Sequence, residues 1–141
     1  MQMLGPVLVL VSRVLAGFSV AFLVPLAWAV ALDERWLQPI WAGGFIGTLV
    51  AALVLGFMVR HHKRELQPKD GFLLVSLVWA LLPACSAVPL MFTVPDVQLA
   101  KAYFEAMSGL TATGATALAG LDELPVSVNV WRCFLQFIGG L

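Results

Sequence analysis

The residues with the clearest capacity for chemistry lie in the run QLAKAYFEAMSGLTATGAT, between Gln98 and Thr116. A bare cation such as potassium needs oxygen atoms inside a membrane to replace the water that it sheds, and backbone carbonyl groups can supply them without a charged side chain. Gly114 can adopt a positive φ at little steric cost, which lets successive carbonyls face one axis. The run therefore predicts a cation-binding loop made of Thr111, Ala112, Thr113 and Gly114.

The segment before this loop is expected to be a short helix, Gln98 to Leu110. At the α-helical rise it spans about 20 Å, well short of the ~30 Å hydrocarbon core that a spanning helix must cross. A half-length helix followed by irregular backbone is tolerated at membrane depth only inside protein or along a watery path. We interpret the pair as a pore helix and a selectivity filter. The alternative is a polar turn at the C-terminus of a helix, where glycine is common.

Glu105 is the one carboxylate within the short helix. It could bind a cation directly, but we expect a structural role, in which it pairs with Lys101 four residues earlier or with a neighbouring backbone donor. Arg132 could also pair with Glu105 or extend to the membrane interface. Serine, histidine and carboxylate residues are not grouped in a catalytic pattern, so the sequence predicts that the protein is not an enzyme.

The composition indicates an all-α integral membrane protein. Hydrophobic residues make up 61% of the 141 residues and charged residues only 11%, whereas soluble domains carry about 25% charged residues. A formal net charge of zero gives no reason to expect a nucleic-acid partner. Cys85 and Cys133 lie in apolar runs and fit small buried residues better than a redox pair, so no cofactor is expected.

Four apolar segments flank the polar loops. The first contains Pro25, which should kink it, and the fourth covers only about 21 Å from Val128, too little to cross a bilayer. The chain is therefore expected to be truncated within its last helix. The segments are Val7–Leu32, Trp36–Val59, Gly71–Val94 and one that begins near Val126.

The second segment carries two further signals. Trp36 and Trp41 stand where an interfacial aromatic belt belongs, and Gly43 and Gly47 form a G-x-x-x-G face that allows helices to approach closely.

Basic residues concentrate in the connector RHHKRELQPKD, from Arg60 to Asp70. The positive-inside rule places this connector and the N-terminus in the cytoplasm, and Asp33 outside. The short helix and its loop then enter the membrane from the outside.

The pattern FEAMSGLTATGAT-x7-LP-x5-WR-x3-QFIGG, from Phe104 to Gly140, resembles the Trk/Ktr/HKT superfamily of potassium transporters, and the bacterial Trk membrane subunit in particular. The resemblance implies four non-identical helix–pore helix–filter–helix repeats around one ion path. It implies that residues 1–66 form a two-helix transmembrane extension and that residues 67–141 form an incomplete first repeat. It places the filter on Thr111, Ala112, Thr113 and Gly114, with ions held by main-chain oxygens, although Ala112 stands where the family often has a hydroxyl residue.

The same resemblance implies potassium as the transported ion, a homodimeric membrane partner and a cytosolic nucleotide-binding regulatory subunit. The expected function is potassium uptake across the bacterial cytoplasmic membrane, with this chain as the N-terminal part of a four-repeat transporter. The alternative is a non-transporting membrane helix module, or a nonfunctional fragment of a broken transporter gene. A self-assembling tetramer of the chain is a third possibility.

Overall fold

The computed structural model of the chain describes residues 4–62 and 64–141, and every regular element in those residues is a helix. Three helices are long and apolar enough to cross a membrane: Gly5–Ala31, Gln38–Val59 and Pro68–Thr93. The first is continuous but is divided into α1 (Gly5–Ser19), a 3₁₀ turn η1 (Val20–Phe22) and α2 (Leu23–Ala31). The predicted all-α membrane architecture with three long apolar helices is thus confirmed.

The 3₁₀ turn η1 lies immediately before the turn that contains Pro25. Proline has no N–H to donate to the carbonyl of Ala21, and its ring crowds the preceding turn. The local geometry therefore changes at the place where the sequence predicts a kink.

The second membrane-length helix, α3 (Gln38–Val59), packs along α1. The close approaches fall on Gly44, where an added Cβ would lie 2.8 Å from the ring of Phe22, and on Gly56, 3.2 Å from Ser12 Oγ. A Cβ at Gly43 or Gly47 would meet no atom within 4 Å. The G-x-x-x-G prediction is therefore wrong for the contacts within this chain, whose close approaches fall on Gly44 and Gly56 instead.

The third membrane-length helix, α4 (Pro68–Thr93), contains Pro83 and Pro89 and remains helical through both. Proline loosens the carbonyls of the preceding turn, and two aromatic side chains from later in the chain donate to carbonyls of α4. Tyr103 Oη donates to Ala80 O at 3.0 Å, and Trp131 Nε1 donates to Ser86 O at 3.3 Å.

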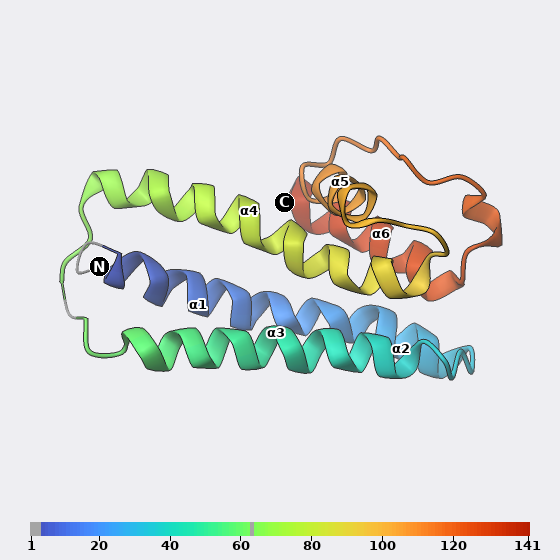
Figure 1. Cartoon of the computed structure of the whole chain (residues 1–141), viewed down its shortest axis with the longest axis horizontal. Helices are drawn as coiled ribbons and strands as arrows, with labels where there is room; N and C mark the ends of the chain where they lie inside the picture. The colour runs from blue at the N-terminus through green and yellow to red at the C-terminus, as the bar shows by residue number, and fades with distance from the viewer. Residues whose placement is uncertain (1–3, 63) are drawn as a thin grey trace.

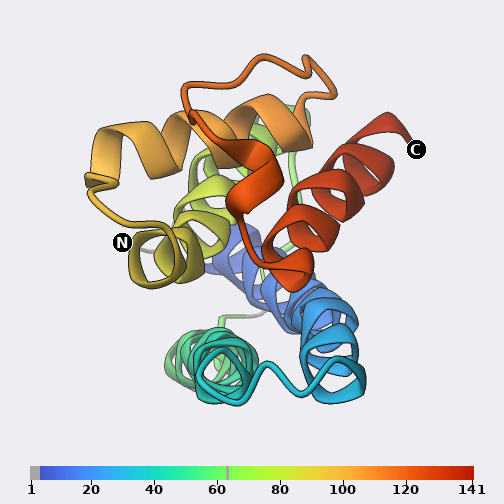
Figure 2. The ribbon, with the colours of Figure 1, turned by 90° about the vertical axis from the view of Figure 1, so that its right-hand side faces the viewer.

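Two shorter helices, α5 (Leu99–Leu110) and α6 (Val126–Gly140), follow, with the 3₁₀ turn η2 (Leu121–Glu123) between them. The predicted short helix, Gln98 to Leu110, begins one residue before α5. The fourth segment begins at Val126, as predicted. Helix α5 is seen nearly end-on in Figure 1 and lengthwise in Figure 2, so it runs across the direction of the long helices. It packs against the C-terminal half of α4 and against α6.

An aromatic cluster joins the leading helices to the later ones. Trp131 of α6 is fully buried and stacks on Phe22, with ring centroids 4.6 Å apart, and its ring centroid lies 5.7 Å from that of Trp41. Trp41 is also fully buried and donates from Nε1 to Ser127 Oγ at 3.1 Å. The assignment of Trp41 to an interfacial belt is therefore wrong, whereas Trp36 is 57% exposed. Residues from both predicted units, 1–66 and 67–141, share this core, and the boundary between them stays a prediction.

The start of α6 is held by the loop between α2 and α3. Glu34 Oε1 accepts a hydrogen bond from the backbone N–H of Val126 at 3.1 Å, across 92 residues of sequence. A carboxylate there satisfies one of the free N–H groups of the first turn and opposes the positive end of the helix dipole. Glu34 thus connects the loop after the first helix to the start of α6.

Candidate functional site

The loop after α5 begins as a tight helix cap. The N–H of Ala112 donates to Gly109 O and the N–H of Thr113 donates to Ser108 O, both at 2.9 Å. This pair of bonds defines a Schellman motif, whose cap residue must adopt a left-handed conformation. That residue is Ala112, with φ of 54°. The helix-capping turn that the sequence left open as an alternative is therefore present at Thr111–Thr113.

The backbone alternates in handedness beyond this point. Ala112 and Gly114 have positive φ values, 54° and 77°. The residues before each of them do not: Thr111 has φ of −87°, and the φ of Thr113 is not positive. The positive φ predicted for Gly114 is confirmed. Alternation of this kind allows successive carbonyl groups to face the same side of the chain, which a regular extended strand does not.

The carbonyl oxygens of residues 111–114 accept no hydrogen bond from the part of the chain that the structure describes. All four residues are exposed. The hydroxyl groups turn back instead: Thr111 Oγ1 donates to Met107 O at 2.8 Å and lies 2.7 Å from Thr113 Oγ1. The loop therefore offers four neutral main-chain oxygens, the kind of ligand that suits a dehydrated alkali cation.

The chain after the loop is tied back to α5 by side chains. Ser108 Oγ donates to Ala115 O at 2.6 Å. The hydroxyl of Thr116 donates to Glu105 Oε1, and the N–H of Ala117 donates to Glu105 Oε2 at 3.2 Å. These bonds hold residues 115–117 at a fixed distance from α5. They therefore also restrict the path of residues 111–114 between them.

Glu105 is the centre of this network. Its side chain is 1% exposed and forms an ion pair with Arg132 of α6, with Nη2 to Oε1 at 3.0 Å and Nε to Oε1 at 3.1 Å. Arg132 also reaches Asn129 Oδ1 at 3.4 Å. The structural role predicted for Glu105 agrees with these contacts, as do the predicted alternatives of a backbone donor and of Arg132, whereas pairing with Lys101 is wrong. Lys101 lies on an exposed position of α5, whereas Glu105 is buried against α6.

Helices α5 and α6 approach each other closely near the loop, and a glycine lies at each close contact. A Cβ added at Gly139 would overlap the carbonyl oxygen of Leu110, and one at Gly109 would lie 3.0 Å from Leu135 Cβ. The contact brings α6 beside the loop, and Gln136 Nε2 lies 3.8 Å from the position that a Cβ on Gly114 would occupy.

Three contributors to the site were missed by sequence reasoning. Ser108, Thr116 and Asn129 hold the loop or the ion pair through hydrogen bonds. Small polar residues in an apolar segment were the available signal, because a hydroxyl or amide group inside a membrane protein needs a partner. Which partner each would find depends on the fold.

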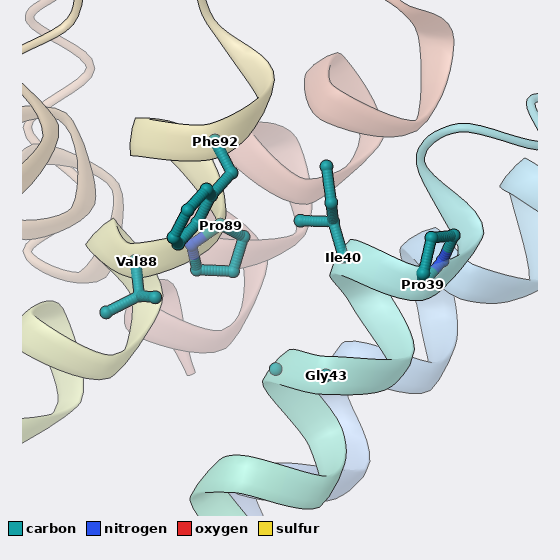
Figure 3. A pocket seen from close by; sticks show the side chains of 7 residues that line it. Pro39, Ile40, Gly43, Val88, Pro89 and Phe92 are labelled. Carbon is teal, nitrogen blue, oxygen red and sulfur yellow. The ribbon is translucent and has the colours of Figure 1, made fainter.

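An apolar groove between α3 and α4 is unsuited to a cation. Figure 3 shows Val88, Pro89 and Phe92 of α4 facing Ile40 and Gly43 of α3. These side chains carry no oxygen that could replace hydration. In the described residues there is also no group of three or more His, Cys, Asp or Glu that could hold a metal ion.

Replacing Ala112 with glycine is expected to stabilise the chain by about 0.5–1 kcal/mol, because a left-handed conformation costs an alanine roughly 1–2 kcal/mol that glycine avoids, less the extra freedom of glycine in the unfolded chain. The measurement is the midpoint of unfolding by sodium dodecyl sulfate, followed by tryptophan fluorescence. Ala51→Gly, at an exposed position inside α3, is the matched control and should lower stability. A lower midpoint for Ala112→Gly would contradict the left-handed cap.

Comparison with known proteins gives one consistent family. The family model described as TrkH, cation transport protein, matches residues 37–141. The Trk system potassium uptake protein TrkH of Vibrio parahaemolyticus is 38% identical over 137 residues, which cover 94% of this chain and 27% of the relative. The protein of the same name from Escherichia coli is 42% identical over 102 residues, 69% of this chain and 21% of the relative.

A solved structure agrees with these relatives. The crystal structure of the potassium transporter TrkH from Vibrio parahaemolyticus superposes with a TM-score of 0.86 at 38% identity, and the match covers 99% of this chain and 30% of that one. The chain spans about a quarter of the length of the curated relatives that it matches.

Proposed function

This chain belongs to the TrkH family of cation transport proteins, and on that basis we propose that it acts in potassium uptake across the bacterial cytoplasmic membrane. Two of its relatives are potassium uptake proteins by name. Three membrane-length helices agree with a multi-pass membrane protein. The proposed cargo is K⁺, and the proposed ligands are the main-chain oxygens of Thr111, Ala112, Thr113 and Gly114.

The observation that carries this proposal is the alternating backbone of residues 111–114, whose four carbonyl oxygens accept no hydrogen bond from the described residues. These residues follow the C-terminal end of α5, which carries roughly half a negative charge and so favours a cation over an anion. The ion would exchange its water for carbonyl oxygens, and no titratable group would have to change its charge.

The chain would supply one quarter of an ion path. Under this proposal, residues 1–66 form a transmembrane extension, and residues 67–141 contribute the first helix, pore helix, filter and part of the second helix of one repeat. The connector after α3 would face the cytoplasm and the loop would enter from the outside. A homodimeric membrane partner and a nucleotide-binding regulatory subunit complete the proposed assembly.

A second candidate function is a membrane helix module that does not transport. The Schellman motif at Thr111–Thr113 favours it, because this motif caps many helices that bind no ion. The motif accounts for the positive φ of Ala112 but not for the positive φ of Gly114. It also does not account for the hydrogen bonds that join Ser108 and Glu105 to residues 115 and 117.

A chimera tests the proposal directly. The chain would replace the matching residues of Vibrio parahaemolyticus TrkH, and the product would be expressed in a bacterium that lacks its own potassium uptake systems. We expect growth at low external potassium and uptake of rubidium, because the similarity of the two structures lets the replaced quarter fit the rest. Unmodified TrkH is the positive control. A chimera that inserts at the level of TrkH but takes up no rubidium would favour the non-transporting module.

A further inference from the structure

Arg13 places a guanidinium group within the first membrane-length helix, about 12 Å along the axis from Gly5 where the helix begins. The side chain is exposed, and among the described residues it takes part in no ion pair. A charge at this depth is costly in hydrocarbon unless it reaches the interface or meets an anion. An anionic partner that meets Arg13 would lower this cost.

Arg13 lines a pocket together with the connector that joins α3 to α4. The polar residues of this pocket are Arg13, His62, Arg64 and Glu65, and its apolar wall is formed by the first turns of α1 and by Leu66. Its lining residues come from α1 and from the connector, and Figure 1 shows that the start of α1, the end of α3 and the start of α4 lie at the same end of the long helices. The pocket thus combines charged side chains with an apolar wall.

The connector is held by polar contacts at the start of α4 and by packing of His62 on α1. Arg64 Nη2 lies 3.2 Å from Oδ2 of Asp70, whose side chain is only 6% exposed, and the same carboxylate oxygen accepts the N–H of Gln67 at 2.9 Å. His62 packs so closely on the first turn of α1 that a Cβ on Gly5 would overlap its ring. Arg64 and His62 are therefore held in place. The planar guanidinium of Arg64 has further N–H groups to donate.

Basic residues outnumber acidic ones at this end of the bundle. Among the described residues there are two acids, Glu65 and Asp70, and four basic residues: Arg13, Arg60, Arg64 and Lys69. Clusters of this composition beside membrane helices attract anionic lipids, and basic pockets between such helices bind lipid headgroups.

We propose that this pocket binds the phosphate headgroup of an anionic phospholipid. Arg13 and Arg64 donate to the phosphate oxygens, and His62 closes the connector side. One acyl chain packs against the apolar wall of the pocket. The site is independent of the filter loop and of the direction in which the chain crosses the membrane.

Native mass spectrometry of the purified chain in detergent tests the site, with phosphatidylglycerol and phosphatidylcholine of identical acyl chains added together. We expect bound phosphatidylglycerol to exceed phosphatidylcholine by about fivefold or more, and Arg13→Gln to remove most of this preference. Arg35→Gln is the matched control, because Arg35 is 83% exposed beside Asp33, at the opposite end of the first helix, and it should keep the full preference. Equal retention of the two lipids by the unmodified chain overturns the proposal, as does a full preference in a helical Arg13→Gln variant.

Two measurements on the unmodified chain decide the question if Arg13→Gln fails to fold. Phosphatidylglycerol is expected to raise the thermal unfolding temperature in detergent above the value in phosphatidylcholine. Inorganic phosphate in excess is expected to leave bound phosphatidylglycerol in place, because it has no acyl chain for the apolar wall. No thermal shift, or displacement by inorganic phosphate, would show a site for a free anion or no site at all, and would overturn the proposal.

Discussion

Replacing Gly114 with valine is expected to abolish rubidium uptake by the transporting chimera. Gly114 has φ of +77°, and a β-branched residue is a rare outlier in that region, at a cost of roughly 1–2 kcal/mol or more. There is room for a side chain, since the nearest atom to an added Cβ is Gln136 Nε2 at 3.8 Å. The effect therefore acts through the backbone. Valine drives φ to negative values, ends the alternation and turns a carbonyl oxygen away from the cation.

Gly120→Val is the matched control for this experiment. Gly120 also has a positive φ, +65°, but lies outside residues 111–114, and an added Cβ would meet Glu123 only at ordinary contact distance, 3.5 Å. The two substitutions impose a similar backbone strain. We expect Gly120→Val to retain most of the uptake. Near-normal uptake in Gly114→Val would contradict the filter assignment, and equal loss in both variants would show that strain alone is responsible.

Replacing Glu105 with alanine is expected to destabilise the chain by about 3–5 kcal/mol, the usual cost of removing one partner of a buried ion pair. Arg132, with a side chain only 17% exposed, would keep its charge without the carboxylate. Thr116 and the N–H of Ala117 would lose their acceptor at the same time. The unfolding midpoint in sodium dodecyl sulfate, read from tryptophan fluorescence, measures the loss.

Two variants make this result specific to the ion pair. Glu105→Asp keeps the charge and shortens the side chain by one methylene, so we expect a smaller loss than for alanine. Glu123→Ala removes an exposed carboxylate in the following loop and should change stability by less than about 0.5 kcal/mol. A loss for Glu105→Ala no larger than that for Glu123→Ala would mean that Arg132 finds another partner and that the network around the loop is not held by Glu105.

The elements of the fold follow closely from local sequence signals. The short helix and the start of α6 fall within one residue of their predicted positions, because Pro95 and Pro125 precede them and the loop TATG ends α5. The predicted positive φ at Gly114 is likewise a local property of glycine. The positive φ at Ala112 is not a local property of alanine, because it depends on the two hydrogen bonds that close the helix cap.

The partners of buried groups could not be predicted in the same way. The sequence offers Glu105 the neighbour Lys101, a backbone donor or Arg132, and only the fold shows that Arg132, 27 residues away on another helix, forms the ion pair. Trp41 has the sequence position of an interfacial residue, but its indole is buried because Trp131 and Ser127 are brought against it. Such contacts depend on how helices pack, and a single segment carries no record of that packing.

The carboxylate of Glu34 on the first amide of α6 has a consequence for biogenesis. A ribosome adds roughly 5–20 residues per second, so the 92 residues between Glu34 and Val126 take roughly five to twenty seconds to synthesise. We therefore expect α1, α2 and α3 to have been synthesised before α6, so that the loop between α2 and α3 is available to bind the first amide of α6 as that helix forms.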